Sequence, residues 1–131
     1  MRGFDFVRYE ESDVAFVGLT NEGVVFTEIK VSNAFDIEHS KQLIKIREEV
    51  GGRQKRRVLY TTNVAVLFPT EEVLNMLVSK ERTRYISAEA YVVKSLQQRL
   101  EGMLYLKSMK PKLPVQFFAT EQEAMDWLLS L

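Results

Sequence analysis

Apolar and polar residues alternate along the first part of the chain in the way that half-buried strands require. The alternation runs over residues 4–9, and two further β-rich runs follow at 14–19 and 24–31. Residues 20–23, Thr-Asn-Glu-Gly, separate these two runs and are turn formers, which is a hairpin signal. We therefore predict that the fold opens with antiparallel strands.

Helical periodicity replaces this alternation in three later segments, at residues 37–50, 70–79 and 95–107. Asp36 is placed to cap the first of these helices, and the glycine pair at 51–52 is placed to end it. On the third, one stripe carries several apolar side chains and a lysine, namely Leu96, Leu100, Met103, Leu104 and Lys107. We expect a charged loop at 80–84, between the second helix and the next strand.

Short apolar runs at 58–62 and 85–93 predict strands that are buried inside a parallel sheet. Residues 63–68 are also apolar, but Pro69 interrupts them, so their assignment stays open. The resulting order is β, β, β, α, β, α, β, α, β, α. It predicts an α/β fold with about four helices on a mixed sheet, antiparallel at its start and parallel in its later βα units.

The last 22 residues, 110–131, form a compact strand and helix unit. Two prolines hold the entry extended, and a short apolar run follows at 115–118. Thr120 and Glu123 then have the spacing of a capping box. Ala124, Trp127, Leu128 and Leu131 lie on one helical face, with Trp127 as the anchor of that face.

Composition limits the class of protein. The 131 residues predict a single domain over 1–131. Lys plus Arg and Asp plus Glu number 18 each, and this balance argues against a nucleic-acid partner. There is no cysteine, no apolar N-terminal leader and no run of ~18 apolar residues, so we expect a cytoplasmic protein with no integral membrane segment.

The C-terminal unit resembles a bacterial family of small uncharacterised STAS/SEC14-type domains, related in fold to the sporulation anti-anti-sigma factor. The family ending is matched by Phe118, Thr120, Ala124, Trp127 and Leu128. The run Ala-Glu-Ala-Tyr-Val-Val at 88–93 is similar to the family's strand of small residues. The resemblance implies a STAS-like fold and a regulatory or binding module rather than an enzyme.

The same resemblance implies a possible phosphorylation switch at the start of the helix after the central strand. Here that stretch is Leu-Phe-Pro-Thr-Glu-Glu at 67–72, and it lacks the family's Asp-Ser-Ser-Gly-like motif. Only Thr70 can stand in the phospho-acceptor position. A helix N-cap is the structural alternative for Thr70, and Glu71 and Glu72 would repel a phosphate.

Glu89 is the second candidate, because it is a carboxylate in the middle of an apolar strand. Such a group is costly inside a sheet unless it is paired. We expect Glu89 either to reach an interface or cleft or to meet an arginine such as Arg84 or Arg99.

Other polar groups point less clearly to a function. His39 is the only histidine, and we interpret it as a surface or capping residue because it has no partner motif for a metal. The basic run at 53–57 could contact nucleic acid, but a solvated loop suits the balanced charge and the lack of aromatic residues in the run. The sequence contains no nucleotide-binding or nucleophile-elbow motif, and we predict no catalytic, cofactor-binding or metal-binding residues.

We therefore predict a non-catalytic regulatory or protein-interaction module whose partner is a second copy of the chain or another protein. Exposed apolar surface is expected on the early hairpin or on the helix at 70–79. The alternative is a domain that binds a small apolar molecule or lipid in a pocket lined by its many phenylalanine and methionine residues.

Overall fold

The structure is a computed structural model that describes residues 3–30, 36–62 and 71–131. Six strands form one sheet in the order β1-β2-β3-β4-β5-β6. Their bounds are β1 Phe6–Glu11, β2 Ala15–Thr20, β3 Val24–Ile29, β4 Arg56–Thr62, β5 Ile86–Val92 and β6 Val115–Phe118. The helices described are α1 Ile37–Val50, α2 Glu71–Leu77, α3 Lys80–Thr83, α4 Leu96–Met109 and α5 Glu121–Leu129.

The sheet is mixed, as the sequence predicts. The first three strands pair antiparallel, β1 with β2 and β2 with β3. From β3 onward every pair is parallel, and each parallel connection passes through at least one helix. Strands that follow one another in sequence are therefore also neighbours in the sheet.

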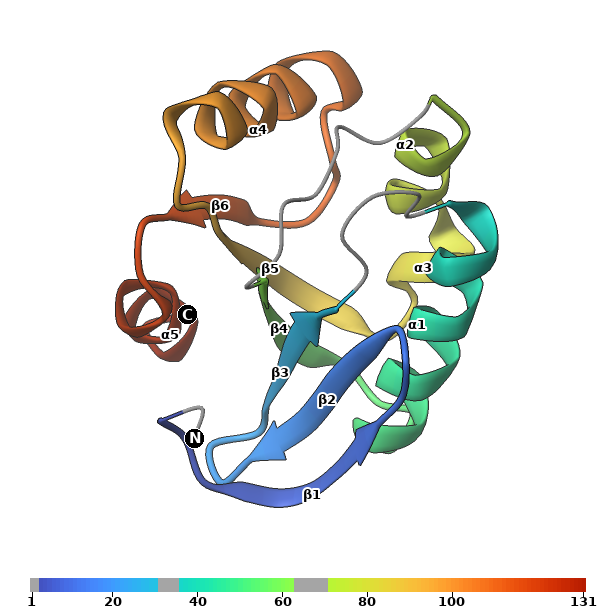
Figure 1. The fold of residues 1–131 in the computed structure, drawn as a ribbon, viewed down its shortest axis with the longest axis vertical. Helices are drawn as coiled ribbons and strands as arrows, with labels where there is room; N and C mark the ends of the chain where they lie inside the picture. Colours follow the sequence, from blue (N-terminus) through green and yellow to red (C-terminus); the bar gives the residue numbers. More distant parts are fainter. Residues whose placement is uncertain (1–2, 31–35, 63–70) are drawn as a thin grey trace.

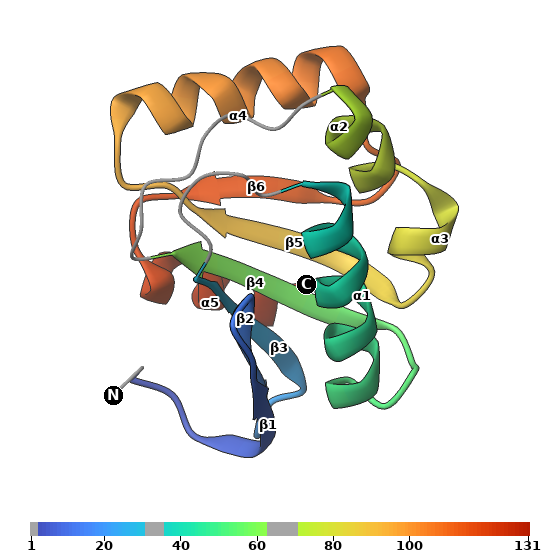
Figure 2. The same cartoon turned by 45° about the vertical axis from the view of Figure 1, so that its right-hand side comes forward.

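The helices lie on both faces of the sheet (Figures 1 and 2). Helix α1 packs on β1, β2 and β3, and α4 packs on β6. Helix α5 packs on the opposite face, against β4 and β5. Two buried clusters follow from this arrangement, one between the sheet and α1, and one between the sheet and α5.

The capping residues explain where α1 and α5 begin. The Asp36 side chain accepts a hydrogen bond from the His39 amide at 3.0 Å, and Nδ1 of His39 accepts one from the Asp36 amide at 3.2 Å. His39 is thus a capping residue, as predicted. The Thr120 hydroxyl accepts from the Glu123 amide at 3.2 Å and donates to the Glu123 carboxylate at 3.0 Å. The cap of α5 is therefore confirmed. The Glu123 carboxylate, however, contacts the Thr120 hydroxyl, whereas in a capping box it would accept from the Thr120 amide.

The structure corrects two boundaries and one helix face. Strand β1 extends to Glu11, two residues beyond the alternation at 4–9. Residues 80–83 form the short helix α3 and not a loop, because the Ser79 side chain accepts from the Arg82 amide and caps it. The last helix face includes buried Met125 in addition to the predicted Ala124 and Leu128, whereas Leu131 lies beyond the end of α5 and is exposed. None of the helices within the described ranges is long and apolar enough to cross a membrane.

Candidate functional site

Glu89 lies in the middle of β5 and is 1% exposed. Its neighbours Ala88 and Ala90 belong to the cluster under α5, so by the alternation of a strand Glu89 points to the other face, where α1 and α4 lie. A carboxylate at this depth requires compensating donors. The groups that supply these donors therefore indicate the role of Glu89.

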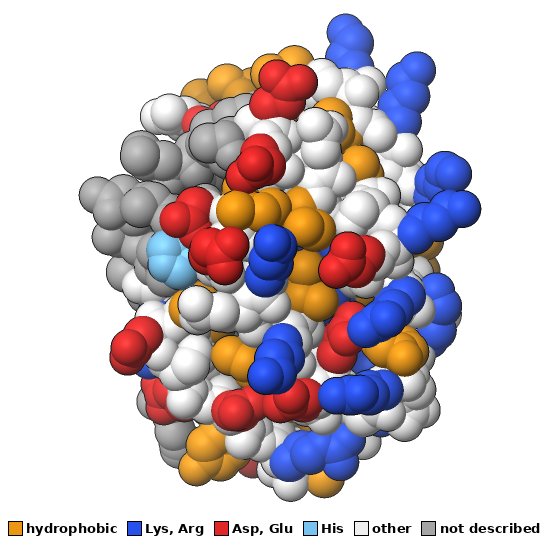
Figure 3. Space-filling model, turned by 90° about the vertical axis from the view of Figure 1, so that its right-hand side faces the viewer, with side chains coloured by type: hydrophobic (Ala, Val, Ile, Leu, Met, Phe, Trp, Pro, Cys, Tyr) orange, Lys and Arg blue, Asp and Glu red, His pale blue; other side chains and the backbone are white. Residues whose placement is uncertain are grey.

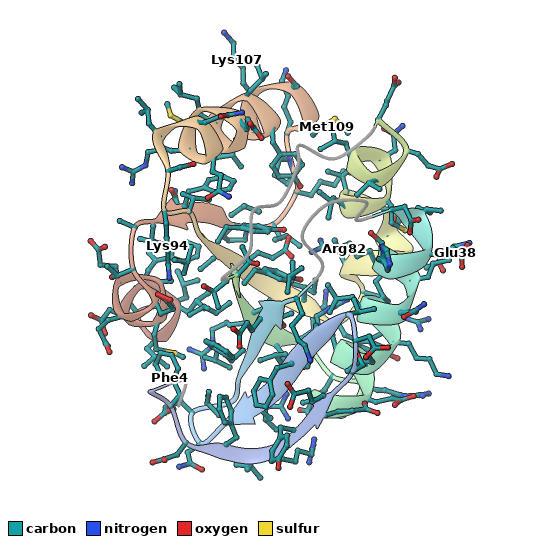
Figure 4. All side chains as sticks on the ribbon, in the orientation of Figure 1. Phe4, Glu38, Arg82, Lys94, Lys107 and Met109 are labelled. Carbon is teal, nitrogen blue, oxygen red and sulfur yellow. The ribbon has the colours of Figure 1, made fainter. Side chains whose placement is uncertain are left out.

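Arg82 supplies the compensating charge from α3. Its guanidinium forms a two-point ion pair with both oxygens of Glu89, and Nη1 lies 3.1 Å from Oε1. Nη1 also donates to the Leu77 carbonyl at 2.9 Å, and Nη2 donates to the Tyr60 hydroxyl at 2.8 Å. The Arg82 side chain extends from α3 toward the sheet (Figure 4), and it joins the end of α2 to β4 and β5.

A row of stacked rings crosses the sheet beside this ion pair. Tyr60 on β4, Tyr91 on β5 and Phe117 on β6 have successive ring-centroid distances of 4.8 and 5.3 Å. Burial raises the pKa of Tyr60 and that of Tyr91 well above the ordinary value, since the phenolate would lose its hydration. Both phenols therefore remain neutral hydrogen-bonding groups at physiological pH.

Tyr105 approaches the same cluster from α4. The residue is buried, and its hydroxyl has no hydrogen-bond partner among the described residues. Burial, followed by the negative charge of Glu89, raises the pKa of Tyr105 to about 12. Next to it, Gly102 lies against the ring of Phe117, and a Cβ atom at Gly102 would come within 2.6 Å of that ring. Gly102 and Tyr105 thus form the side of α4 that faces the sheet.

The raised pKa values predict how the protein responds to alkali. Tyr60, Tyr91 and Tyr105 ionise near pH 10 in the unfolded chain but stay protonated in the folded one. This contribution to folding is fully present below about pH 10 and declines as the pH rises toward 12, because the unfolded chain releases its protons first. We expect the absorbance of tyrosinate to show at most two of the five tyrosines ionised at about pH 11 while the fold persists. Simultaneous ionisation of four or more, with the circular dichroism unchanged, would contradict this burial.

Two further contacts connect α1 to the same region. Nη2 of Arg47 donates to the Arg82 carbonyl at 2.8 Å and so ties α1 to α3. Arg84 forms a two-point ion pair with Glu48, at 2.9 and 3.2 Å. The expectation that Glu89 meets an arginine is therefore confirmed, but that arginine is Arg82 and neither of the two examples named, Arg84 and Arg99. Arg84 follows α3 and points to α1, while Arg99 lies exposed on α4.

The contacts of Glu89 indicate a structural role. Both of its oxygens are engaged by Arg82, and the Arg82 donors that face Glu89 and Tyr60 are occupied. An anion that binds Nη1 and Nη2 at this side of the guanidinium would have to displace a buried carboxylate. The network holds α2, α3, β4 and β5 together.

Thr70, the candidate phospho-acceptor, lies outside the described residues. Helix α2 begins at Glu71, and Glu71 and Glu72 are both exposed in its first turn. Within residues 3–30, 36–62 and 71–131, no three His, Asp or Glu side chains are close enough together to hold a metal ion.

Half of the basic run at 53–57 is used in structural contacts. Arg56 donates to the Gly51 carbonyl at 2.9 Å, just after α1. Arg57 donates to the carbonyls of Leu128 and Glu22, at 3.0 and 3.1 Å. These guanidinium groups tie loops to helix ends, which leaves Arg53 and Lys55 as the exposed members of the run.

Helix α4 presents an apolar stripe to solvent, which the sequence analysis did not identify as an exposed surface. Leu96, Leu100, Met103 and Leu104 are 73%, 57%, 58% and 56% exposed. At 100° per residue they lie opposite Gly102 and Tyr105, the side that faces the sheet. Helix α4 lies at the top of the molecule in Figure 1, and basic side chains project at that level in Figure 3. We call these four residues the outward face of α4.

The structure does not place exposed apolar surface where the sequence predicted it. The predicted hairpin forms β2, which is buried, and β3, which is mostly buried. Exposed apolar side chains lie instead on the neighbouring strand β1, where Val7 and Tyr9 are 61% and 65% exposed. The helix predicted at 70–79 does not carry such a surface among its described residues: Val73 is buried, and the other apolar side chains of α2 are half-buried. One signal in the sequence could have indicated that the leucine stripe is exposed. Helix α4 has a second apolar side, because Tyr105 and Met109 fall opposite the stripe.

A small hollow lies between β3, β4 and the end of α1. It is lined by both apolar and charged residues, namely Val25, Arg47, Glu48, Gly51, Gln54, Arg56, Val58 and Tyr85. This hollow has no room for even a water-sized sphere. It therefore does not supply the apolar pocket of the alternative hypothesis.

Comparisons with known proteins address the family and the fold. A family model described as a domain of unknown function, DUF7793, matches residues 18–131. The chain is similar in structure to an uncharacterised protein of the DUF3478 family with a SpoIIAA-like fold from Shewanella loihica PV-4. The TM-score is 0.57 at 12% identity, covering 98% of this chain and 95% of that one. No curated protein sequence matches. The predicted STAS-like, SpoIIAA-like fold is thus confirmed.

Proposed function

This chain belongs to the domain-of-unknown-function family DUF7793, and we propose that it is a non-catalytic protein-interaction module that docks through the outward face of α4. The observation that carries the proposal is the exposure of four large apolar side chains in one stripe. Contiguous apolar surface on a soluble domain marks an interaction site more often than single exposed residues do.

The stripe has the geometry of a docking helix. Leu96, Leu100, Met103 and Leu104 follow the spacing of the anchor residues that amphipathic helices place into a partner's groove. Helix α4 is fixed to the domain by its other side, through Tyr105 and Gly102. Docking of a partner on the stripe would therefore leave the core of the domain intact.

The contacts of Glu89 support a non-catalytic role. Its carboxylate is engaged by Arg82 and enclosed by tyrosine side chains. An apolar pocket for a small molecule or lipid is the less supported alternative. Several of the phenylalanines that could line one pack against each other in the cluster that includes Phe16 and Phe26.

Site-directed crosslinking tests the proposal, and the absence of cysteine from the chain makes the labelling specific. A Met103→Cys variant carrying a benzophenone maleimide is irradiated in an extract of the host cells. A Lys41→Cys variant on α1, where the side chain is also exposed, is the matched control. We expect a defined crosslinked species from position 103 and none from position 41.

Competition makes the result specific to the outward face of α4. Unlabelled native protein should suppress the crosslink, and unlabelled Leu100→Glu protein should not, because a carboxylate in the stripe opposes burial. Equal crosslinking from positions 103 and 41, or equal suppression by both competitors, would overturn the proposed docking face.

A further inference from the structure

The charge around the outward face of α4 indicates what kind of protein covers it. Resting on the proposed function, we infer that the occupant is an acidic amphipathic helix of another protein. Three properties of this face point to that occupant. They are the spacing of the stripe, the sign of the charges beside it, and a poor match to a second copy of the chain or a lipid surface.

The spacing is that of a seam between two helices. Leu96, Leu100 and Met103 are separated by four and then three residues, the alternation of core positions in a heptad repeat. Continued along the helix, the same alternation falls on Lys107, and Lys110 follows as the C-cap of α4. The seam is therefore apolar in its first half and cationic in its second half, and a partner helix must match both.

The charges beside the stripe are mainly basic. Residues 96–112 contain four basic side chains and one acidic side chain, a net charge of +3, so the remainder of this neutral chain carries −3. The four basic residues are all exposed, namely Arg99, Lys107, Lys110 and Lys112. The single acidic residue, Glu101, lies about 115° around the helix from the centre of the stripe at 100° per residue. A partner with carboxylates along its seam would complement this surface.

A second copy of the chain fits less well. Antiparallel pairing centred on the apolar stripe would place Lys107 beside Lys94 and the N-terminus of the partner's α4, where the helix dipole is also positive. Parallel pairing would place Lys107 against Lys107. In both arrangements like charges meet across the seam, which is unfavourable.

A lipid surface also fits less well. Helices that lie in a membrane interface have a wide apolar face, usually with aromatic residues, and basic residues at its borders. The stripe on α4 has no aromatic member, because Tyr105 is turned toward the sheet. One border is formed by Gln97, Ser108 and Glu101 instead of basic residues. The stripe is therefore narrow and basic on one side only.

Binding of designed peptides tests the inference. The probe is a fluorescent three-heptad helix with leucine at the core positions that face Leu96, Leu100 and Met103. Glutamate occupies the core position that faces Lys107 and the flanking positions. The matched control peptide carries lysine in place of each glutamate. By fluorescence anisotropy, we expect the acidic peptide to bind at least about tenfold more tightly than the basic one, because like charges across an interface are strongly disfavoured.

Variants test whether the preference for the acidic peptide comes from the basic residues Lys107 and Lys110. Lys107→Glu combined with Lys110→Glu should reverse the preference between the two peptides, while Leu100→Glu should weaken binding of both. A Lys41→Glu variant on α1 should change neither affinity. Equal binding of the two peptides, or no binding of either, would overturn the acidic-helix inference. Crosslinking from position 103 would still test the docking face itself.

Two further measurements test the other two possible occupants, a second copy of the chain and a lipid surface. Sedimentation velocity reports whether the protein alone forms a dimer that Leu100→Glu dissociates, and such a dimer would overturn the inference in favour of a second copy. Flotation with phosphatidylcholine vesicles, with and without phosphatidylglycerol, reports membrane binding. Flotation that needs phosphatidylglycerol and is lost on charge reversal at Lys107 and Lys110 would overturn it in favour of a lipid surface. We expect a monomer that does not float.

Discussion

Replacement of Arg82 by alanine is expected to lower the free energy of unfolding by about 3–5 kcal/mol, the cost of leaving one member of a buried ion pair without its partner. Glu89 is 1% exposed, so its charge would remain in the protein interior, with tyrosine hydroxyls beside it in place of the guanidinium. The Tyr60 hydroxyl and the Leu77 carbonyl would lose a donor as well. Since small domains are stable by about 5–15 kcal/mol, this single change would remove a large part of the total. Urea unfolding followed by circular dichroism measures it.

The chain contains its own control, a second two-point arginine–glutamate pair in a wetter place. The Arg84 side chain is 57% exposed, so solvent screens its pair with Glu48 much more than it screens the buried pair. Arg84→Ala should therefore destabilise far less than Arg82→Ala. Replacing both members of the buried pair, Arg82→Met with Glu89→Leu, should recover much of the loss, because no charge is then left buried. Equal small effects of Arg82→Ala and Arg84→Ala would show that the buried network does not hold the fold.

Replacement of Tyr105 by alanine is expected to destabilise the protein by about 3 kcal/mol, whereas replacement of its neighbour Leu104 should change stability by no more than about 0.5 kcal/mol. Tyr105 is 6% exposed, and Leu104 is 56% exposed. The two residues are adjacent on one helix, so helix propensity contributes little to the difference. Thermal and urea unfolding of the two alanine variants measure the contrast.

The sign of this contrast reports which way α4 faces. If the leucine stripe were the side that packs on the sheet, Leu104→Ala would be the more damaging change. A conservative variant, Tyr105→Phe, keeps the ring and removes the hydroxyl that has no hydrogen-bond partner among the described residues. It should leave stability unchanged or slightly raised, because a buried hydroxyl without a partner is costly. A large loss in Tyr105→Phe would instead indicate that the hydroxyl makes a contact essential to the fold.

Local signals sufficed for much of the fold. Helix α1 spans residues 37–50 as predicted, because an Asp36 cap and the glycine pair at 51–52 mark its two ends. The strand and helix at the C-terminus were equally well marked by Thr120 and Glu123. The change from alternating to helical periodicity gave the order of elements, and that order determines a mixed sheet.

The partner of Glu89 could not be predicted in the same way. Sequence shows that a carboxylate inside an apolar strand needs a cation, but Arg82, Arg84 and Arg99 are all near it along the chain. The choice depends on α3, a single turn that Ser79 caps and that directs Arg82 inward and Arg84 toward α1. Such a short helix carries too few residues for periodicity to show.

The orientation of α4 was hidden for a different reason. One side of the helix carries leucines and a methionine, and the opposite side carries Gly102, Tyr105 and Met109. Periodicity alone gives the larger apolar side as the buried one. The structure buries the other side, because Gly102 allows the helix backbone to approach the Phe117 ring and Tyr105 reaches toward the Arg82–Glu89 pair. Close approach at a glycine is a tertiary contact, which the pattern on one helix cannot reveal.

Thiol reactivity gives the most direct test of the central claim that the outward face of α4 is open in the isolated protein. The chain has no cysteine, so the reaction rate of a Met103→Cys variant with a maleimide reports that position alone. The rate should approach that of the same variant in denaturant, because Met103 is 58% exposed. A rate slowed about a hundredfold, equivalent to about 2.7 kcal/mol of protection, would contradict the account, since the face would then be covered in the absence of any partner.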